Sequence, residues 1–123
     1  MKQTISFNSV EHEQAFQNVL EVTNARSEYF ADDKFYQSMI YILTSDFLRN
    51  KFDYITNDTD EIFEIDYSMS NVNLSSTERF MMTYALKMYF SATEHDYDFA
   101  YWFYQLDKGN QEVMLNSLKF IQH

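Results

Sequence analysis

The sequence predicts an all-α fold: a single domain over residues 1–123, built as a compact bundle of five to seven short helices with a short extended N-terminal arm. Proline is absent and glycine occurs once, at Gly109, whereas tight hairpin turns depend on glycine or asparagine at positions of positive φ. Apolar residues recur at helical spacing through most of the chain, behind residues that favour helix caps. Aromatic residues make up 19% of the sequence, which is typical of a folded core and not of a disordered chain.

The first predicted helix covers about residues 9–26. Residues 4–7 alternate weakly between polar and apolar, as a short extended arm does. Asn8 and Glu11 have the spacing of an N-cap residue and the third helical residue, which predicts the helix start. The residues of its inward face are His12, Phe16, Val19, Leu20 and Thr23.

A second helix is predicted after Asp32 or Asp33, since either residue can cap it. Residues 44–46, Thr-Ser-Asp, either continue this helix or break it and cap a shorter one that contains Phe47, Leu48 and Phe52. The apolar stripe of the second helix comprises Tyr36, Met39, Ile40, Leu43 and Phe47, widened by Phe35 and Ile42.

Residues 53–74 carry the weakest pattern in the chain. Residues 57–60 have the composition of a turn followed by a helix cap. The apolar residues within 62–65 fit either one helical turn or a short strand. Residues 68–73 form a polar loop. The pattern therefore leaves the secondary structure of this segment open.

Three further helices are predicted in the C-terminal half. Ser75 and Glu78 have the spacing of a capping box, which starts a helix that runs through about residue 92. Asp96 precedes the next helix and is expected to cap it. Gly109 is expected at the left-handed C-cap of that helix, with Asn110 as the N-cap of the last one. The apolar stripes of the three helices are Phe80, Met81, Tyr84, Ala85, Met88 and Tyr89; Phe99, Trp102, Phe103 and Leu106; and Met114, Leu118 and Ile121.

Three segments of the chain also carry a family resemblance. They are residues 5–12 with Phe16 following, residues 33–44, and residues 75–80 leading into Ala85 and Leu86. In this layout the chain resembles a small uncharacterised domain-of-unknown-function family of Gram-positive bacteria and their phages. The tryptophan- and glycine-bearing segment of that family is replaced here by residues 66–71. The resemblance implies a compact fold and a mobile-element setting, and it implies no catalytic residue.

The charge of the chain is strongly negative and unevenly spread. Nineteen acidic residues face nine basic ones, for a formal net charge of −10. Between Lys51 and Arg79 there is no basic residue, and the carboxylates there are Asp53, Asp58, Asp60, Glu61, Glu64, Asp66 and Glu78. A second base-free stretch, between Lys87 and Lys108, adds Glu94, Asp96, Asp98 and Asp107. Such a field repels nucleic acid and anionic membranes, and it attracts basic protein surfaces.

Several classes of function lack their sequence signals. The single glycine excludes Walker and dinucleotide-binding loops, and no Gly-x-Ser-x-Gly elbow occurs. The absence of cysteine excludes disulfides and thiolate metal sites. The start of the chain lacks the apolar run of a signal peptide, and no stretch has the length of a membrane span, so a cytoplasmic location is expected. We expect no enzyme activity, no cofactor and no metal.

Two polar sites have both a functional and a structural interpretation. His12 could act as a general base or a metal ligand, but its place on an apolar face favours a hydrogen-bonded histidine at the edge of the core. The cluster at residues 94–98 could bind a cation, but it lacks the glycine and glutamate positions of an EF-hand loop. Asp96 is more simply a helix cap that complements the helix dipole.

The aromatic helix that follows this cluster suggests a binding surface. Tyr97, Tyr101 and Tyr104 recur at i, i+4 and i+7, which defines a face separate from the apolar stripe; burial of the helix on two sides is the alternative. The predicted partner-binding surface comprises Asp58, Asp60, Glu61, Glu64, Glu94, Asp96, Tyr97, Asp98, Tyr101 and Tyr104. Tyrosines rimmed by acids suit a basic protein partner.

The main functional hypothesis is therefore a small acidic protein-binding module, with no direct binding to nucleic acid or membrane. It would block a basic, nucleic-acid-binding surface of its partner, as an inhibitor from a phage or mobile element could. One alternative is a self-associating helical accessory domain that forms a homodimer. Another is a divalent-cation-dependent enzyme that uses Glu94, Asp96 and Asp98.

Overall fold

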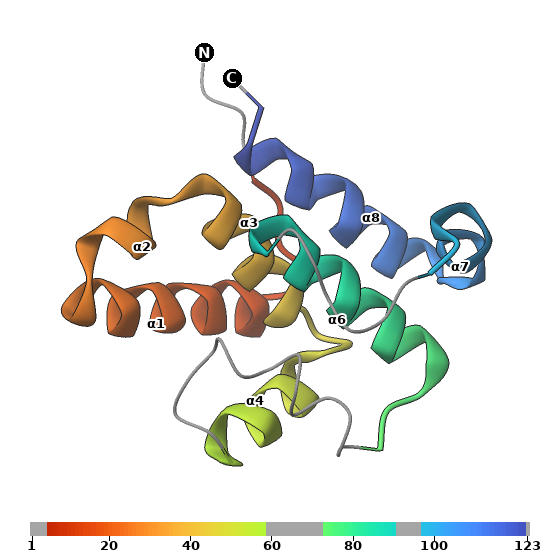
Figure 1. The fold of residues 1–123 in the computed structure, drawn as a ribbon, viewed down its shortest axis with the longest axis horizontal. Coiled ribbons are helices and arrows are strands. Elements are labelled where there is room, and N and C mark those ends of the chain that lie inside the picture. The colour runs from red at the N-terminus through yellow and green to blue at the C-terminus, as the bar shows by residue number, and fades with distance from the viewer. Residues whose placement is uncertain (1–4, 59–72, 91–96, 123) are drawn as a thin grey trace.

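A computed structural model describes residues 5–58, 73–90 and 97–122 of the chain, with the side chains of 54–58 excepted. These residues form seven α-helices and one short 3-10 helix, without a strand among them (Figure 1), which confirms the predicted all-α class. The elements are α1 (Val10–Arg26), α2 (Glu28–Asp32), α3 (Lys34–Leu43), α4 (Arg49–Asp58), α6 (Ser76–Tyr89), α7 (Phe99–Gln105), α8 (Lys108–Ser117) and η2 (Leu118–Phe120).

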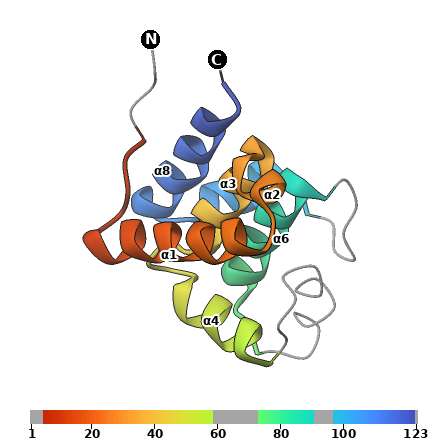
Figure 2. The ribbon, with the colours of Figure 1, turned by 90° about the vertical axis from the view of Figure 1, so that its left-hand side faces the viewer.

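Helix α3 lies at the centre of the bundle. Every residue from Ser38 to Leu43 is buried, because α3 contacts α1, α2, α6, α8 and η2 on different sides. The views in Figures 1 and 2 place α1, α6 and α8 around it. A helix that is apolar on all sides is stable only when it is covered in this way. The predicted inward residues Tyr36, Met39, Ile40 and Leu43 are in the core, whereas Phe35 and Phe47 are exposed.

The start of α1 differs from the prediction by one residue. Ser9, and not Asn8, is the N-cap, since the Ser9 hydroxyl accepts a hydrogen bond from the His12 amide at 3.0 Å. Asn8 is engaged elsewhere: its side-chain oxygen accepts from the backbone amide of Asp46 at 3.2 Å. A contact with the turn after α3 therefore decides between the two candidate caps. The buried His12 and Phe16 confirm the predicted inward face of α1.

The segment between α1 and α4 resolves the alternatives left by the sequence. Asp33 caps α3 by accepting from the Tyr36 amide at 2.9 Å, while Asp32 is the last residue of α2, a helix that the sequence pattern did not predict. The break after Leu43 is confirmed. The side-chain hydroxyls of Thr44 and Ser45 donate to the carbonyls of Ile40 and Ile42, which closes the end of α3.

Helix α4 begins later and continues further than predicted. It starts at Arg49, so Phe47 and Leu48 lie in the connecting turn and only Phe52 of the three predicted residues is helical. It extends through Asp58, so the turn predicted at 57–60 does not begin at Asn57. The other predictions for 59–72, including the choice between helix and strand at 62–65, lie outside the described residues.

The helix of the predicted capping box is confirmed as α6. The Ser75 hydroxyl accepts from the Glu78 amide at 3.1 Å, and the Glu78 carboxylate accepts from the Ser75 amide at 2.8 Å. These two bonds satisfy backbone donors that the first helical turn otherwise leaves unpaired. The helix ends at Tyr89 instead of about residue 92.

Both predicted boundaries around α7 and α8 are wrong by a few residues. Asp98, not Asp96, caps α7, and Asp107, not Asn110, caps α8. The Asn110 amide donates to the Asp107 carboxylate at 2.8 Å, which places Gly109 inside the first turn of α8. Helix α7 ends at Gln105, and its C-cap residue Leu106 has an extended backbone. The helix therefore needs no left-handed glycine, and Gly109 does not adopt a positive φ.

No helix within the described parts of the chain combines the length and the apolar character needed to cross a bilayer.

Candidate protein-interaction surface

Helix α7 exposes more aromatic surface than its packing requires. Five of its seven residues are aromatic, and none of the seven is fully buried. Phe99, Tyr101 and Tyr104 are exposed by 48%, 56% and 78%. Large aromatic side chains carry the greatest free energy of burial per residue. Their exposure on one short helix is therefore the main feature of this structure that calls for a function.

Helix α7 is held on the bundle by one side. The Trp102 ring lies on the ring of Phe80 in α6, with centroids 6.4 Å apart, and the Gln111 side chain of α8 donates to the Phe103 carbonyl at 3.0 Å. The Asp98 carboxylate caps the helix by accepting from the Tyr101 amide at 3.3 Å. These contacts fix the backbone, so the outward rings are presented from an anchored helix.

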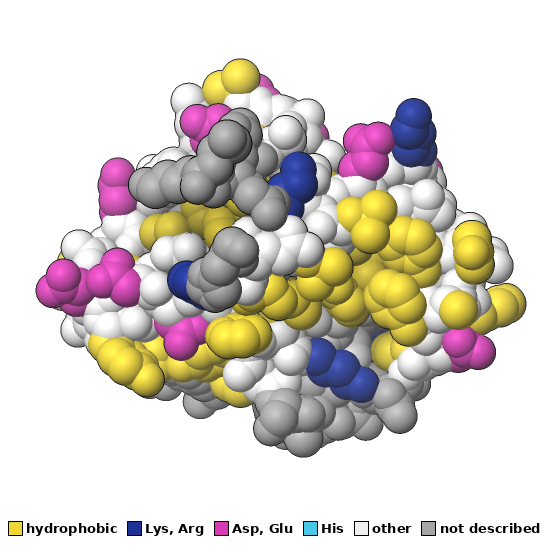
Figure 3. Space-filling model, turned by 90° about the horizontal axis from the view of Figure 1, so that it is seen from above, with side chains coloured by type: hydrophobic (Ala, Val, Ile, Leu, Met, Phe, Trp, Pro, Cys, Tyr) yellow, Lys and Arg dark blue, Asp and Glu magenta, His cyan; other side chains and the backbone are white. Residues whose placement is uncertain are grey.

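Hydrophobic side chains gather on the half of the molecule where α7 lies. Seen from above, they form a nearly continuous area in Figure 3, whereas the acidic side chains drawn there lie mostly toward the edges of the molecule. We use the term aromatic face for Tyr101 and Tyr104, which are three residues apart and therefore lie on one side of α7. Exposed apolar areas of this kind mark contact sites more often than scattered single residues do.

A small hollow lies beside the Phe99 ring, where α7 meets α6. Its volume is about 80 Å³, and its lining residues are Phe80, Thr83, Tyr84, Lys87, Tyr97 and Phe99. A cavity of about 150 Å³ holds a benzene molecule, so this hollow can take only a small side chain or part of a larger one. The hollow is therefore too small for a substrate pocket, but it can hold part of a side chain of a bound protein.

The predicted surface residues are partly brought together. Tyr101 and Tyr104 lie exposed on α7, and Asp98 lies exposed at its start. Tyr97 precedes the helix and is half-buried, with its ring 5.8 Å from that of Phe80. The remaining six residues lie outside the part of the chain whose side chains are described: Asp58, Asp60, Glu61, Glu64, Glu94 and Asp96.

Phe99 contacts Phe80 and Tyr84 of α6, as its place on the predicted apolar stripe requires, but its side chain stays 48% exposed. It is the first residue of α7, and its ring stacks on that of Phe103 at 5.4 Å. The density of aromatic residues in the heptapeptide was the only signal for it. Spacing alone could not identify its exposure, because spacing does not show that the end of this short helix is left partly uncovered.

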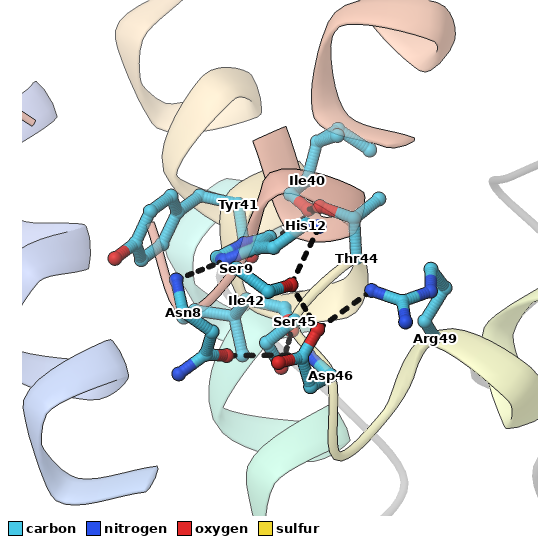
Figure 4. A network of polar contacts seen from close by, with 10 residues as sticks. All are labelled: Asn8, Ser9, His12, Ile40, Tyr41, Ile42, Thr44, Ser45, Asp46 and Arg49. Atoms are coloured by element: carbon cyan, nitrogen blue, oxygen red, sulfur yellow. Dashed lines mark hydrogen bonds and ion pairs between the residues drawn. The ribbon is translucent and has the colours of Figure 1, made fainter. Parts of the chain in front are cut away.

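His12 lies in a polar network at the other candidate site (Figure 4). Its ring is fully buried; Nδ1 accepts from the Asn8 amide at 3.0 Å, and Nε2 lies 2.8 Å from the Tyr41 carbonyl, to which it donates. Burial lowers the pKa of His12, although the bond to Tyr41 acts in the opposite direction. This confirms the structural interpretation of His12.

Ser9 and Asp46 of the same network do not complete a catalytic triad. The Ser9 hydroxyl donates to the Asp46 carboxylate at 2.6 Å and not to the imidazole. Arg49 also donates to Asp46, at 2.8 Å. Burial acts to raise the pKa of Asp46, but the hydrogen bonds from Ser9 and Arg49 and the charge of Arg49 outweigh it and lower the pKa. Both ring nitrogens of His12 are occupied, so this arrangement offers no base to activate Ser9.

Among the side chains described, those of residues 5–53, 73–90 and 97–122, no three histidine or acidic groups are arranged to share a metal ion. Two of the residues of the cation-dependent alternative, Glu94 and Asp96, lie outside these ranges.

Comparison of the chain with protein-family models, with curated proteins and with solved structures gives no match. The family resemblance of the three sequence segments therefore stays a prediction.

Proposed function

We propose that this chain is an acidic protein-binding module that docks the aromatic face of α7 onto a basic surface of another protein. The observation that carries the proposal is the exposure of Tyr101 and Tyr104 on a helix with no fully buried residue. Tyrosine is enriched among the residues that dominate binding energy, because it combines a large contact area with a hydroxyl group and few rotatable bonds.

The charge of the chain supports a basic partner. A net charge of −10 on 123 residues raises the local concentration of positively charged surfaces and accelerates their association. Asp98 is the N-cap of α7, and Glu94 and Asp96 lie within the three residues that precede Tyr97 in the chain. A nucleic-acid-binding protein offers a basic surface of the required kind, so the chain would act as an inhibitor that competes with nucleic acid, in keeping with a phage or mobile-element origin.

The test uses tagged protein to capture partners from an extract of the source organism. The variant Tyr101→Ala/Tyr104→Ala removes two exposed rings, and Tyr29→Ala is the matched control, since Tyr29 is 75% exposed and lies on α2 at the opposite end of the bundle from α7 (Figure 1). We expect a partner that is retained by the wild type and by Tyr29→Ala, and lost with the double variant.

The captured protein is then measured at low and high ionic strength, with and without nucleic acid. Affinity should fall at high salt, because exposed charges are screened beyond a Debye length of about 8 Å at physiological ionic strength. Nucleic acid should compete for the partner. If the affinity for the partner changes with neither salt concentration nor added nucleic acid, the basic-surface proposal is contradicted, whatever the effect of the tyrosine substitutions.

Self-association through the same face is the second candidate. The exposed rings are uncharged and could bury one another, but two copies of a chain with a charge of −10 repel each other. Sedimentation at micromolar concentration separates the two functions. A wild-type dimer that becomes tighter at high salt, and that does not form in the double tyrosine variant, would support self-association over binding of a different protein.

A further inference from the structure

The N-terminal arm, residues 5–8, is fastened to the bundle by a small set of contacts. The Tyr41 hydroxyl donates to the Ser6 carbonyl, and the Phe7 ring lies 5.0 Å from His12 and 5.5 Å from both Phe16 and Tyr41. At the end of the arm, the backbone amide of Asn8 donates to His12 Nδ1, and the Asn8 side-chain oxygen accepts from the Asp46 amide at 3.2 Å. Most of these contacts converge on the imidazole and on the Tyr41 ring next to it.

Only one protonation state of His12 satisfies its neighbours. Nε2 must carry a hydrogen to donate to the Tyr41 carbonyl, and Nδ1 must carry none to accept from Asn8. A proton added at Nδ1 would point at the backbone N–H of Asn8. The two nitrogens, 3.0 Å apart, would then both be donors, with no acceptor between them. It would also place a positive charge in a fully buried ring.

The charged groups around His12 do not offer the added proton a partner. Asp46, in the turn after α3, attracts the imidazolium electrostatically, and Arg49 of α4 repels it. The Asp46 oxygen Oδ1 already accepts from both Ser9 and Arg49. Phe7 and Tyr41 contribute rings to the surroundings. The charged ring can gain a hydrogen-bond acceptor only if the arm moves away and admits water.

We propose that His12 makes the N-terminal arm a latch that mild acid opens. In the neutral state the imidazole holds Asn8, and Phe7 covers the rings of His12, Phe16 and Tyr41. Protonation removes the acceptor for the Asn8 backbone amide, and the two remaining hydrogen bonds, from the Tyr41 hydroxyl to Ser6 and from the Asp46 amide to Asn8, then no longer hold the arm. The contacts of α3 with α6 and α8 do not involve His12 and stay in place. The released state uncovers an aromatic area on α1 and α3 that is separate from the aromatic face of α7.

The experiment uses a variant in which His12 is the only histidine. His95→Gln/His123→Gln removes the other two, so every histidine signal in a proton NMR titration belongs to His12. We expect the amide of Asn8 and the ring signals of Phe7 to shift with the same midpoint as His12, below pH 6.5. The amides of α6 should keep their protection from hydrogen exchange.

Two outcomes overturn the proposal: titration of His12 without any change in the arm, or loss of arm and α6 signals together at one midpoint. Asp46→Asn provides an independent check in the same background. Removal of the carboxylate charge destabilises the imidazolium, so both the His12 midpoint and the arm transition should move to lower pH by the same amount. An arm transition that stays in place while the His12 midpoint moves also contradicts the latch.

Discussion

Thr83, on α6, allows a direct test of how its side chain is buried against the rest of the bundle. Its side chain is 2% exposed, and its hydroxyl has no hydrogen-bond partner among the described residues. A buried hydroxyl without a partner loses its hydration and gains nothing in return, at a cost of about 1–3 kcal/mol. Thr83→Val replaces the hydroxyl by a methyl group of similar size, and the helix propensities of the two residues are similar. The variant should therefore be more stable by about 1 kcal/mol.

Thr44→Val is the matched control for this prediction. Thr44 is equally buried, but its hydroxyl donates to the Ile40 carbonyl at 2.7 Å. The same chemical change should therefore destabilise the protein by about 1 kcal/mol, the usual net value of a hydrogen bond. Because the Thr44 amide also donates to this carbonyl at 2.9 Å, the carbonyl keeps one partner and the loss stays moderate.

The assay is equilibrium unfolding in urea, followed by circular dichroism and by the fluorescence of Trp102. The free energy of unfolding should rise in Thr83→Val and fall in Thr44→Val. In thermal unfolding of the same variants, the expected shifts of Tm are roughly 4 °C in opposite directions for a chain of this size. A destabilised Thr83→Val variant would show that its hydroxyl has a partner, and the packing described for α6 would then be wrong.

Three other predictions concern stability. Gly109→Ala should stabilise the protein by about 0.5–1 kcal/mol in urea unfolding. Gly109 lies in α8 without a positive φ, and an added Cβ would meet only the Asp107 carboxylate, at 3.7 Å. A loss of stability would support the left-handed C-cap instead. Ser75→Ala should cost about 1 kcal/mol by removing half of the capping box, and an unchanged unfolding midpoint would count against that cap. The pKa of His12 is lower in the folded than in the unfolded chain, so the unfolded state binds the extra proton first as pH falls. The contribution of His12 to the free energy of unfolding is therefore complete above pH 6.5 and declines below it. Stability in the variant with His12 as the only histidine should follow that direction between about pH 7.5 and 5, and a rise on acidification over this range would contradict the burial of the neutral ring.

The central helix was predictable because its pattern is redundant. Residues 39–43 are all apolar, and a run of this kind within a longer amphipathic pattern can only be buried. The capping box of Ser75 was equally predictable, since both members lie in one turn and need no distant partner. Helix α2 was missed because five residues are too few for a periodic pattern.

Helix caps were mispredicted where several candidates lie close together. Both Asp96 and Asp98 can cap the helix that follows, as can Asp107 and Asn110 for the next one. The choice depends on how α7 packs on α6 and α8, and local spacing does not contain that information. Since α7 begins after Asp98, Tyr97 lies outside the helix, so the i, i+4 relation that placed it beside Tyr101 does not apply.

Composition and spacing together pointed to a tyrosine face on α7, but spacing did not predict the exposure of Phe99. The heptapeptide of α7 has more aromatic residues than one inward stripe can bury, which predicted exposure for Tyr101 and Tyr104. Phe99 and Trp102 both have the spacing of the buried stripe, yet only Trp102 is half-buried while Phe99 is exposed. Short helices anchored at one side do not bury the whole stripe, and their sequence does not show where they are anchored.

The most direct test of the aromatic face is nitration of tyrosine in the free and the partner-bound protein. In the free protein Tyr29, Tyr101 and Tyr104 should all react, since each is more than half exposed. In the complex we expect Tyr101 and Tyr104 to become protected while Tyr29 reacts as before. Protection of Tyr29 with continued reaction of Tyr101 and Tyr104 would place the contact surface elsewhere and would contradict the account.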